Sequence, residues 1–123
     1  MIIIGDNSIP YSDTFTTIKS IDEIKTTPPN SVVLFEFDID ILKYTYENNI
    51  SSAVLVTNIK QTIYAHNLNT TYIIVEKNLA KTIQNIAETY MFDSKILTQI
   101  KHDDEIEEIA LLGIDGVIYL DNI

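Results

Sequence analysis

Acidic, hydroxyl and ammonium side chains follow the short apolar runs of this sequence. The most suggestive stretch is Glu36-Phe-Asp38-Ile-Asp40, in which three carboxylates alternate with apolar residues directly after the run that starts at Val32. Carboxylates that converge can hold Mg²⁺ or exchange protons with a substrate. Polar side chains that end other runs are Asp6, Thr57-Asn58, Glu76-Lys77, Lys101-His102 and Asp121.

The order of several of these residues matches a known pattern of an aspartate pair, a hydroxyl, a lysine and a final acid. Here the pattern consists of Asp38, Asp40, Thr57, Lys77 or Lys81, and Asp121. It resembles the signature of the haloacid dehalogenase-like phosphatases. The resemblance implies that Asp38 is the nucleophile and Asp40 the general acid and base. Thr57 and a lysine would hold the phosphate, and Asp121 would join the two aspartates at Mg²⁺.

The same positions also have a purely structural explanation. Strand ends must turn into helices, and Asp, Asn, Ser and Thr occur there as helix caps and turn formers. The sequence departs from the phosphatase signature at Ile41-Leu42, where the family has Gly-Thr or Gly-Val. We therefore predict no catalytic, cofactor-binding or metal-binding residues. The phosphatase set, with Mg²⁺ at Asp38, Asp40 and Asp121, is the alternative.

Charge and composition limit the classes of partner. The chain has 18 acidic residues against eight lysines, no arginine, no cysteine and a net charge of −10. An acidic chain without arginine is a poor ligand for nucleic acid or for an anionic membrane. The start, Met1-Ile-Ile-Ile-Gly-Asp, lacks the basic region of a signal peptide, and no apolar run approaches the roughly 20 residues of a membrane span. We expect a cytoplasmic protein.

Short apolar runs rich in β-branched residues recur along the chain and predict strands. They begin at Ile2, Phe15, Val32, Ala53, Tyr72, Ile96 and Val117, with a unit of about 20 residues from the third run onward. Helical periodicity between them predicts helices at 40–49, 58–68, 78–92 and 103–112, and a short turn of helix at 21–26. The expected caps are Asp40, Asn58, Asn78 and Ser20, and Gly113 is expected to end the fourth helix.

Alternation of strands and helices predicts one α/β domain over residues 1–123. We expect a three-layer sandwich with a mostly parallel, doubly wound sheet of about six short strands, Rossmann-like or flavodoxin-like. A half-barrel of the (β/α)8 type is the competing architecture, and the sequence leaves the choice between the two open. The expected function is that of a small binding or assembly module without catalysis, which associates with itself or with another protein.

Overall fold

The seven strands form a single sheet. The computed structural model describes residues 1–123, with these strands and helices in chain order: β1 Ile2–Ile4, β2 Phe15–Thr17, α1 Ile21–Ile24, β3 Val32–Glu36, α2 Ile39–Glu47, β4 Ser52–Leu55, α3 Ile59–Asn67, β5 Tyr72–Val75, α4 Lys77–Thr89, β6 Lys95–Gln99, α5 Glu105–Leu111, β7 Gly116–Ile118 and a final 3₁₀ turn Leu120–Asn122. All neighbouring strands are parallel. The predicted α/β fold with a parallel sheet is confirmed, with seven strands in place of about six.

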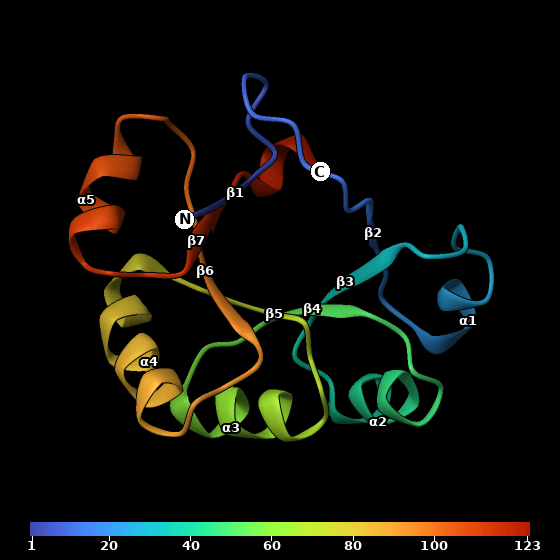
Figure 1. Cartoon of the computed structure of the whole chain (residues 1–123). Helices are drawn as coiled ribbons and strands as arrows, with labels where there is room; N and C mark the ends of the chain where they lie inside the picture. Colours follow the sequence, from blue (N-terminus) through green and yellow to red (C-terminus); the bar gives the residue numbers. More distant parts are fainter.

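The sheet is wound in one direction and curled. Its strand order is β1-β7-β6-β5-β4-β3-β2, so that consecutive strands from β2 to β7 are neighbours. Right-handed crossovers between such neighbours all lie on the same face of a sheet. Figure 1 shows α1 to α5 around the outside of the curl. This is the winding of the half-barrel alternative; the expected layer of helices on the second face is absent.

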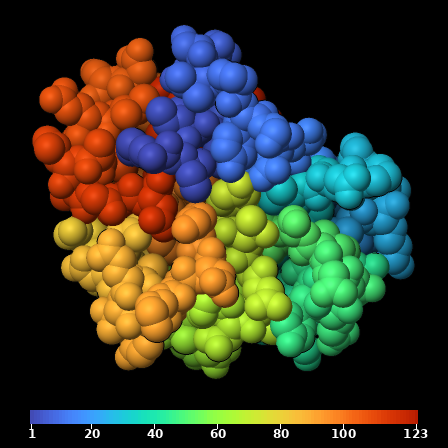
Figure 2. All heavy atoms as spheres, in the orientation of Figure 1, coloured from blue at the N-terminus to red at the C-terminus, as the bar shows by residue number.

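Side chains of the sheet itself fill the inside of the curl. Alternation along each strand sends one set of residues outward to the helices, such as Val33, Phe35 and Val54. The other set packs together on the inner face and includes Leu34, Ile74, Leu97 and Ile118. Figure 2 shows atoms filling the region that the ribbon leaves open. Both faces of the strands are therefore buried, which explains the continuous apolar runs.

A segment without regular structure, residues 5–14, connects β1 to β2 and is called the strap below. β1 and β2 are the two edges of the sheet and are not paired with each other. The strap is tied to the sheet by the Tyr72 hydroxyl, which donates to Asp13 Oδ2 at 2.6 Å and lies 2.5 Å from the Tyr11 hydroxyl. Tyr119 donates to Asp6 Oδ2 at 3.1 Å. These bonds attach the strap to Tyr72 of β5 and to Tyr119, which follows β7.

Helix caps decide where several helices begin. Ser20 and Asn58 cap α1 and α3 as expected, and Gly113 follows α5 with a φ of +75°. α2 begins one residue early, because Asp38 and not Asp40 is its cap. α4 begins at Lys77, so that the expected cap Asn78 lies inside the helix. No helix of the protein is both long and apolar enough to cross a lipid bilayer.

Candidate functional site

The carboxyl ends of the strands surround a depression at one end of the curled sheet, called the mouth below. Three adjoining cavities of about 600, 390 and 620 Å³ lie there. The first and second share Glu36, Phe37 and Leu55, and the second and third share Glu76 and Gln99. Ligands of open parallel sheets bind at this edge, so the mouth is the candidate site.

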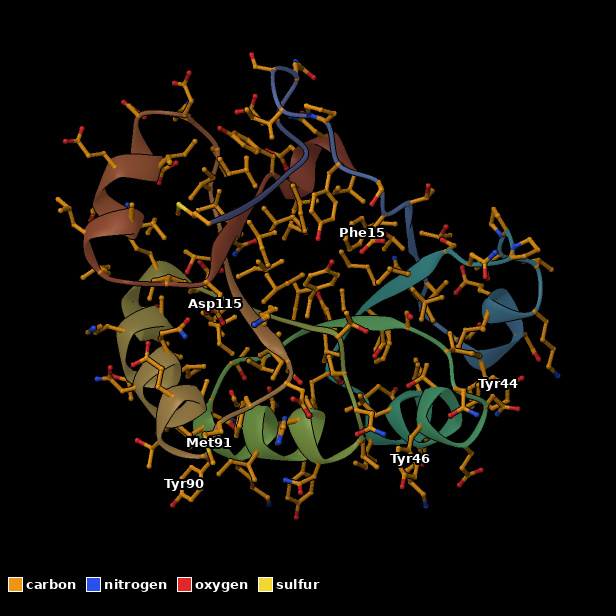
Figure 3. All side chains as sticks on the ribbon, viewed as in Figure 1. Phe15, Tyr44, Tyr46, Tyr90, Met91 and Asp115 are labelled. Atoms are coloured by element: carbon orange, nitrogen blue, oxygen red, sulfur yellow. The ribbon has the colours of Figure 1, made fainter.

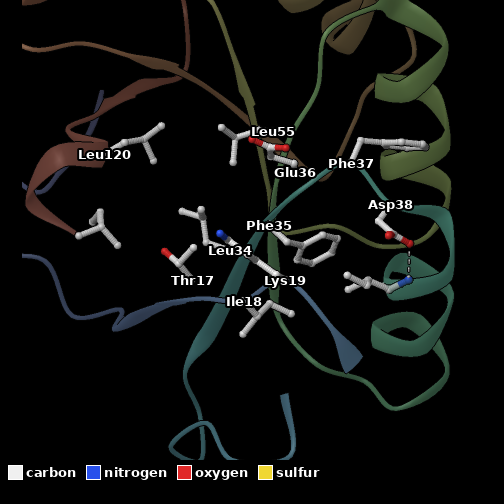
Figure 4. Close-up of a pocket in the computed structure, with 12 residues that line it drawn as sticks. Thr17, Ile18, Lys19, Leu34, Phe35, Glu36, Phe37, Asp38, Leu55 and Leu120 are labelled. Atoms are coloured by element: carbon white, nitrogen blue, oxygen red, sulfur yellow. Dashed lines mark hydrogen bonds between the residues drawn. The ribbon is translucent and has the colours of Figure 1, made fainter. Parts of the chain in front are cut away.

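The first of these cavities is the most apolar and is called the apolar cavity below. Eight of its 12 lining residues are hydrophobic. Leu34 of β3 belongs to the inner core, Leu55 of β4 and Leu120 of the final turn pack against that core, and Thr17 ends β2 beside them. Figure 4 shows these side chains around the cavity. It lies where β2, the free edge of the sheet, faces the end of the chain.

Three charged side chains, Lys19, Glu36 and Asp38, line the apolar cavity, and none of them forms an ion pair. The ion pairs of the protein join Lys25 to Asp22 and Lys77 to Glu105 and Glu108. Lys19 and Glu36 are exposed to solvent, and Glu36 makes no side-chain hydrogen bond. Lys19 and Glu36 therefore border the cavity without a side-chain partner of opposite charge, whereas Asp38 is bonded to the backbone of α2.

Asp38 and Asp40 serve the start of α2. Asp38 Oδ1 accepts the backbone N–H groups of Asp40 at 2.9 Å and Ile41 at 3.2 Å, and the second of these bonds is the dashed line in Figure 4. Asp40 lies in the first turn of the helix, where a negative charge is favoured by the helix dipole. Asp38 borders the apolar cavity, whereas Asp40 borders none of the three mouth cavities.

The remaining residues of the phosphatase alternative lie around the mouth and on its outer side; they are Thr57, Lys77, Lys81 and Asp121. Thr57 donates its hydroxyl to Gln61 Oε1 at 3.1 Å and borders the second cavity, whereas Lys77 and Asp121 border the third. Lys81 donates to the Leu112 carbonyl at the end of α5. The structure brings Lys77 and Asp121 to one cavity and leaves Asp38 and Thr57 in two others. No group of three or more histidine, aspartate and glutamate side chains is placed to share a metal ion.

The ammonium group of Lys77 forms ion pairs with two carboxylates at the start of α5. Its ammonium lies 3.2 Å from carboxylate oxygens of both Glu105 and Glu108, which raises the pKa of Lys77. Glu105 also accepts the backbone N–H groups of Lys101 and His102, at 2.9 and 3.0 Å. These two bonds, followed by the contact with Lys77, lower the pKa of Glu105 to about 2. The ammonium of Lys77 thus has two carboxylate partners at the start of α5.

No sequence motif predicts several of the residues that line the mouth. Glu36 was recognised only as part of the acidic stretch, although its alternation with Leu34 signals the inner face. Gln99 and Glu76 are hydrogen-bonded to each other across two neighbouring strands. Lys19 carries no sequence signal, because the strand before it is only three residues long. No family model and no curated protein sequence matches this chain.

Proposed function

We propose that the protein is a binding module that holds a small, largely apolar molecule in the apolar cavity. The observation that carries the proposal is the cavity itself, with about 600 Å³ and a lining that is two-thirds hydrophobic, eight residues of 12. Sites for small ligands occupy about 300–1,000 Å³ and combine an apolar wall with a few polar groups. Leu34, Leu55 and Leu120 supply the wall, while Thr17, Lys19 and Glu36 supply polar atoms.

The two ends of the curled sheet differ in a way that supports this location. Tyr72 lies at the start of β5, is buried, and packs against Phe15 with ring centroids 5.6 Å apart. Together with the hydrogen bonds to the strap, it fills the inner face at the amino-terminal edge. At the carboxyl edge, Leu55 and Leu120 are only partly buried. Apolar surface of the inner face therefore remains open to a ligand at the mouth.

Nuclear magnetic resonance with the neutral probe 3-methylbutan-1-ol tests the proposal. Addition of the alcohol is expected to shift the amide signals of residues 17–19, 34–38 and 55. Thr17→Trp and Leu55→Trp each place an indole in the cavity and are expected to remove the shifts. Leu111→Trp is the control, because Leu111 is 83% exposed on α5, outside the cavity. Unchanged signals around the cavity, or shifts that survive both indoles, would contradict the proposal.

Self-association is a second candidate function, and the outer surface of α2 and α3 favours it. Tyr46 on α2 and Ile59, Ile63 and Tyr64 on α3 are large exposed side chains. Figure 3 shows Tyr46 pointing away from the sheet. α3 contains no acidic residue, in a chain with a net charge of −10. Two copies would repel each other least where acids are absent, and apolar aromatic surface is typical of interfaces.

Light scattering after size-exclusion chromatography measures this association. We expect a dimer at high protein concentration that Ile63→Glu converts to a monomer, because the new carboxylates would face each other in an interface. Leu111→Glu adds the same charge at another exposed position and is expected to leave the dimer unchanged. A wild-type protein that stays monomeric at every concentration would exclude this candidate.

A further inference from the structure

Lys19 and Glu36 at the apolar cavity have opposite signs and come from neighbouring strands, whereas the third charged side chain there, Asp38, is hydrogen-bonded to the start of α2. β2 and β3 pair with Thr17 opposite Leu34, and Ile18 donates its N–H to the Leu34 carbonyl at 2.9 Å. Lys19 and Glu36 each follow two residues further along, at the carboxyl ends. Both side chains line the cavity, yet they form no ion pair within 4.0 Å. An ammonium group and a carboxylate thus border the apolar cavity without pairing with each other.

The chemistry of this border selects among ligands with an apolar body. An anionic ligand would meet Lys19 but would be repelled by Glu36, by Asp38 and by the net charge of −10. A cationic ligand would meet Glu36 but would be repelled by Lys19. A ligand that carries both charges beside an apolar group satisfies both residues, because each charged contact is then of opposite sign.

We propose that the apolar cavity binds a free α-amino acid with an apolar side chain, an inference that rests on the proposed binding function. The α-ammonium group faces Glu36, and the α-carboxylate faces Lys19. The side chain lies against Leu34, Leu55 and Leu120. The roughly 600 Å³ of the cavity accommodates branched aliphatic as well as aromatic side chains.

Four probes with the same branched alkyl body separate the contributions of the two charges. L-leucine carries both charges, 3-methylbutan-1-amine only the positive one, 4-methylpentanoate only the negative one, and 3-methylbutan-1-ol neither. Titration followed by nuclear magnetic resonance is expected to show L-leucine binding about five- to tenfold more tightly than either singly charged probe. The shifted amides are expected to be those around Thr17, Glu36 and Leu55.

Charge-removing variants assign each end of the ligand. Lys19→Gln is expected to weaken binding of L-leucine and 4-methylpentanoate about fivefold and to strengthen binding of the amine, which Lys19 repels. Glu36→Gln is expected to weaken binding of L-leucine and the amine and to strengthen binding of 4-methylpentanoate, which Glu36 repels. Both positions are exposed, so the fold is retained. Lys95→Gln and Glu88→Gln, exposed positions that border none of the mouth cavities, are matched controls with no expected effect.

The outcomes separate this inference from the function on which it rests. If the alcohol binds in the cavity and L-leucine binds no more tightly than a singly charged probe, the amino-acid ligand is excluded and the apolar binding function survives. The same holds if Lys19→Gln and Glu36→Gln affect all four probes equally. If none of the four probes shifts the amides around the cavity, both proposals fail.

Discussion

Gly116→Ala is expected to lower the free energy of unfolding by about 3 kcal/mol, at the upper end of the usual cost of an overpacked core. A Cβ atom at Gly116 would lie 2.4 Å from the Ile2 carbonyl oxygen, 2.6 Å from Ile2 Cβ and 2.8 Å from Leu97 Cδ2. Two of these atoms belong to β1, which pairs only with β7. The methyl group must therefore displace the edge strand that carries the strap. Urea unfolding followed by circular dichroism measures the loss.

Gly113→Ala is the matched control for this substitution. Gly113 has a φ of +75°, and nothing lies within 4 Å of the position of a Cβ atom. Alanine there costs only backbone strain, about 1 kcal/mol. A loss at Gly116 no larger than the loss at Gly113 would show that β1 does not pack against β7 as closely as the structure has it.

The sequence predicted the strands better than it predicted how they are wound. Runs such as Val32–Phe35 and Tyr72–Val75 are apolar throughout, and each became a strand buried on both faces. An apolar run of this kind shows that both faces of the strand are covered, but it does not show whether helices or other strands cover them. Helices on both sides and a sheet curled onto itself satisfy the same pattern, because Leu34 is equally buried by a helix or by the other inner-face side chains of the sheet. Strand order had to come from the structure.

Capping residues in the sequence predicted that a helix begins or ends near them, but they predicted the exact boundary less accurately. Asp38 and Asp40 are both good capping residues, and sequence alone does not distinguish a cap from a first-turn acid two residues later. The ends of α2 and α3 are followed by Asn49 and Asn69 with positive φ, a conformation that asparagine tolerates better than most residues. No glycine marks those two ends, so the sequence placed them only approximately.

The candidate site could be predicted only as an edge of the sheet. The carboxyl edge was expected from the parallel fold, and Glu36, Asp38 and Thr57 do lie at the mouth. Which of them face one cavity depends on the curl, which brings Leu120 close to Leu34 and Leu55. Leu120 and Leu34 are 86 residues apart in the chain, and nothing local in the sequence relates them. Of the acids that stand out in the sequence, Asp38 caps α2 and Asp40 lies in its first turn, whereas most of the cavity lining is hydrophobic.

Tyr72→Phe is expected to lower the free energy of unfolding by about 2 kcal/mol at neutral pH, the cost of a lost hydrogen bond to a charged group. Tyr72 is 4% exposed, and its hydroxyl is the link between β5 and both Asp13 and Tyr11 of the strap. Phenylalanine keeps the ring packed against Phe15 but leaves the Asp13 carboxylate without this donor. Thermal unfolding measures the effect. Tyr64→Phe, at a 45% exposed position without a side-chain hydrogen bond, is the control with no expected change.

The difference between wild type and Tyr72→Phe is expected to shrink as the pH rises above about 10. Burial, followed by the hydrogen bonds to Asp13 and Tyr11, raises the pKa of Tyr72 in the folded protein. Between the ordinary and the raised pKa, the unfolded chain loses the proton while the folded chain keeps it, so the stability gained from Tyr72 declines with pH. Burial and the bond to Asp6 raise the pKa of Tyr119 to about 12, so the variant still loses some stability in the same range. A difference that stays constant from pH 7 to pH 11 would mean that the Tyr72 hydroxyl is not buried against the strap.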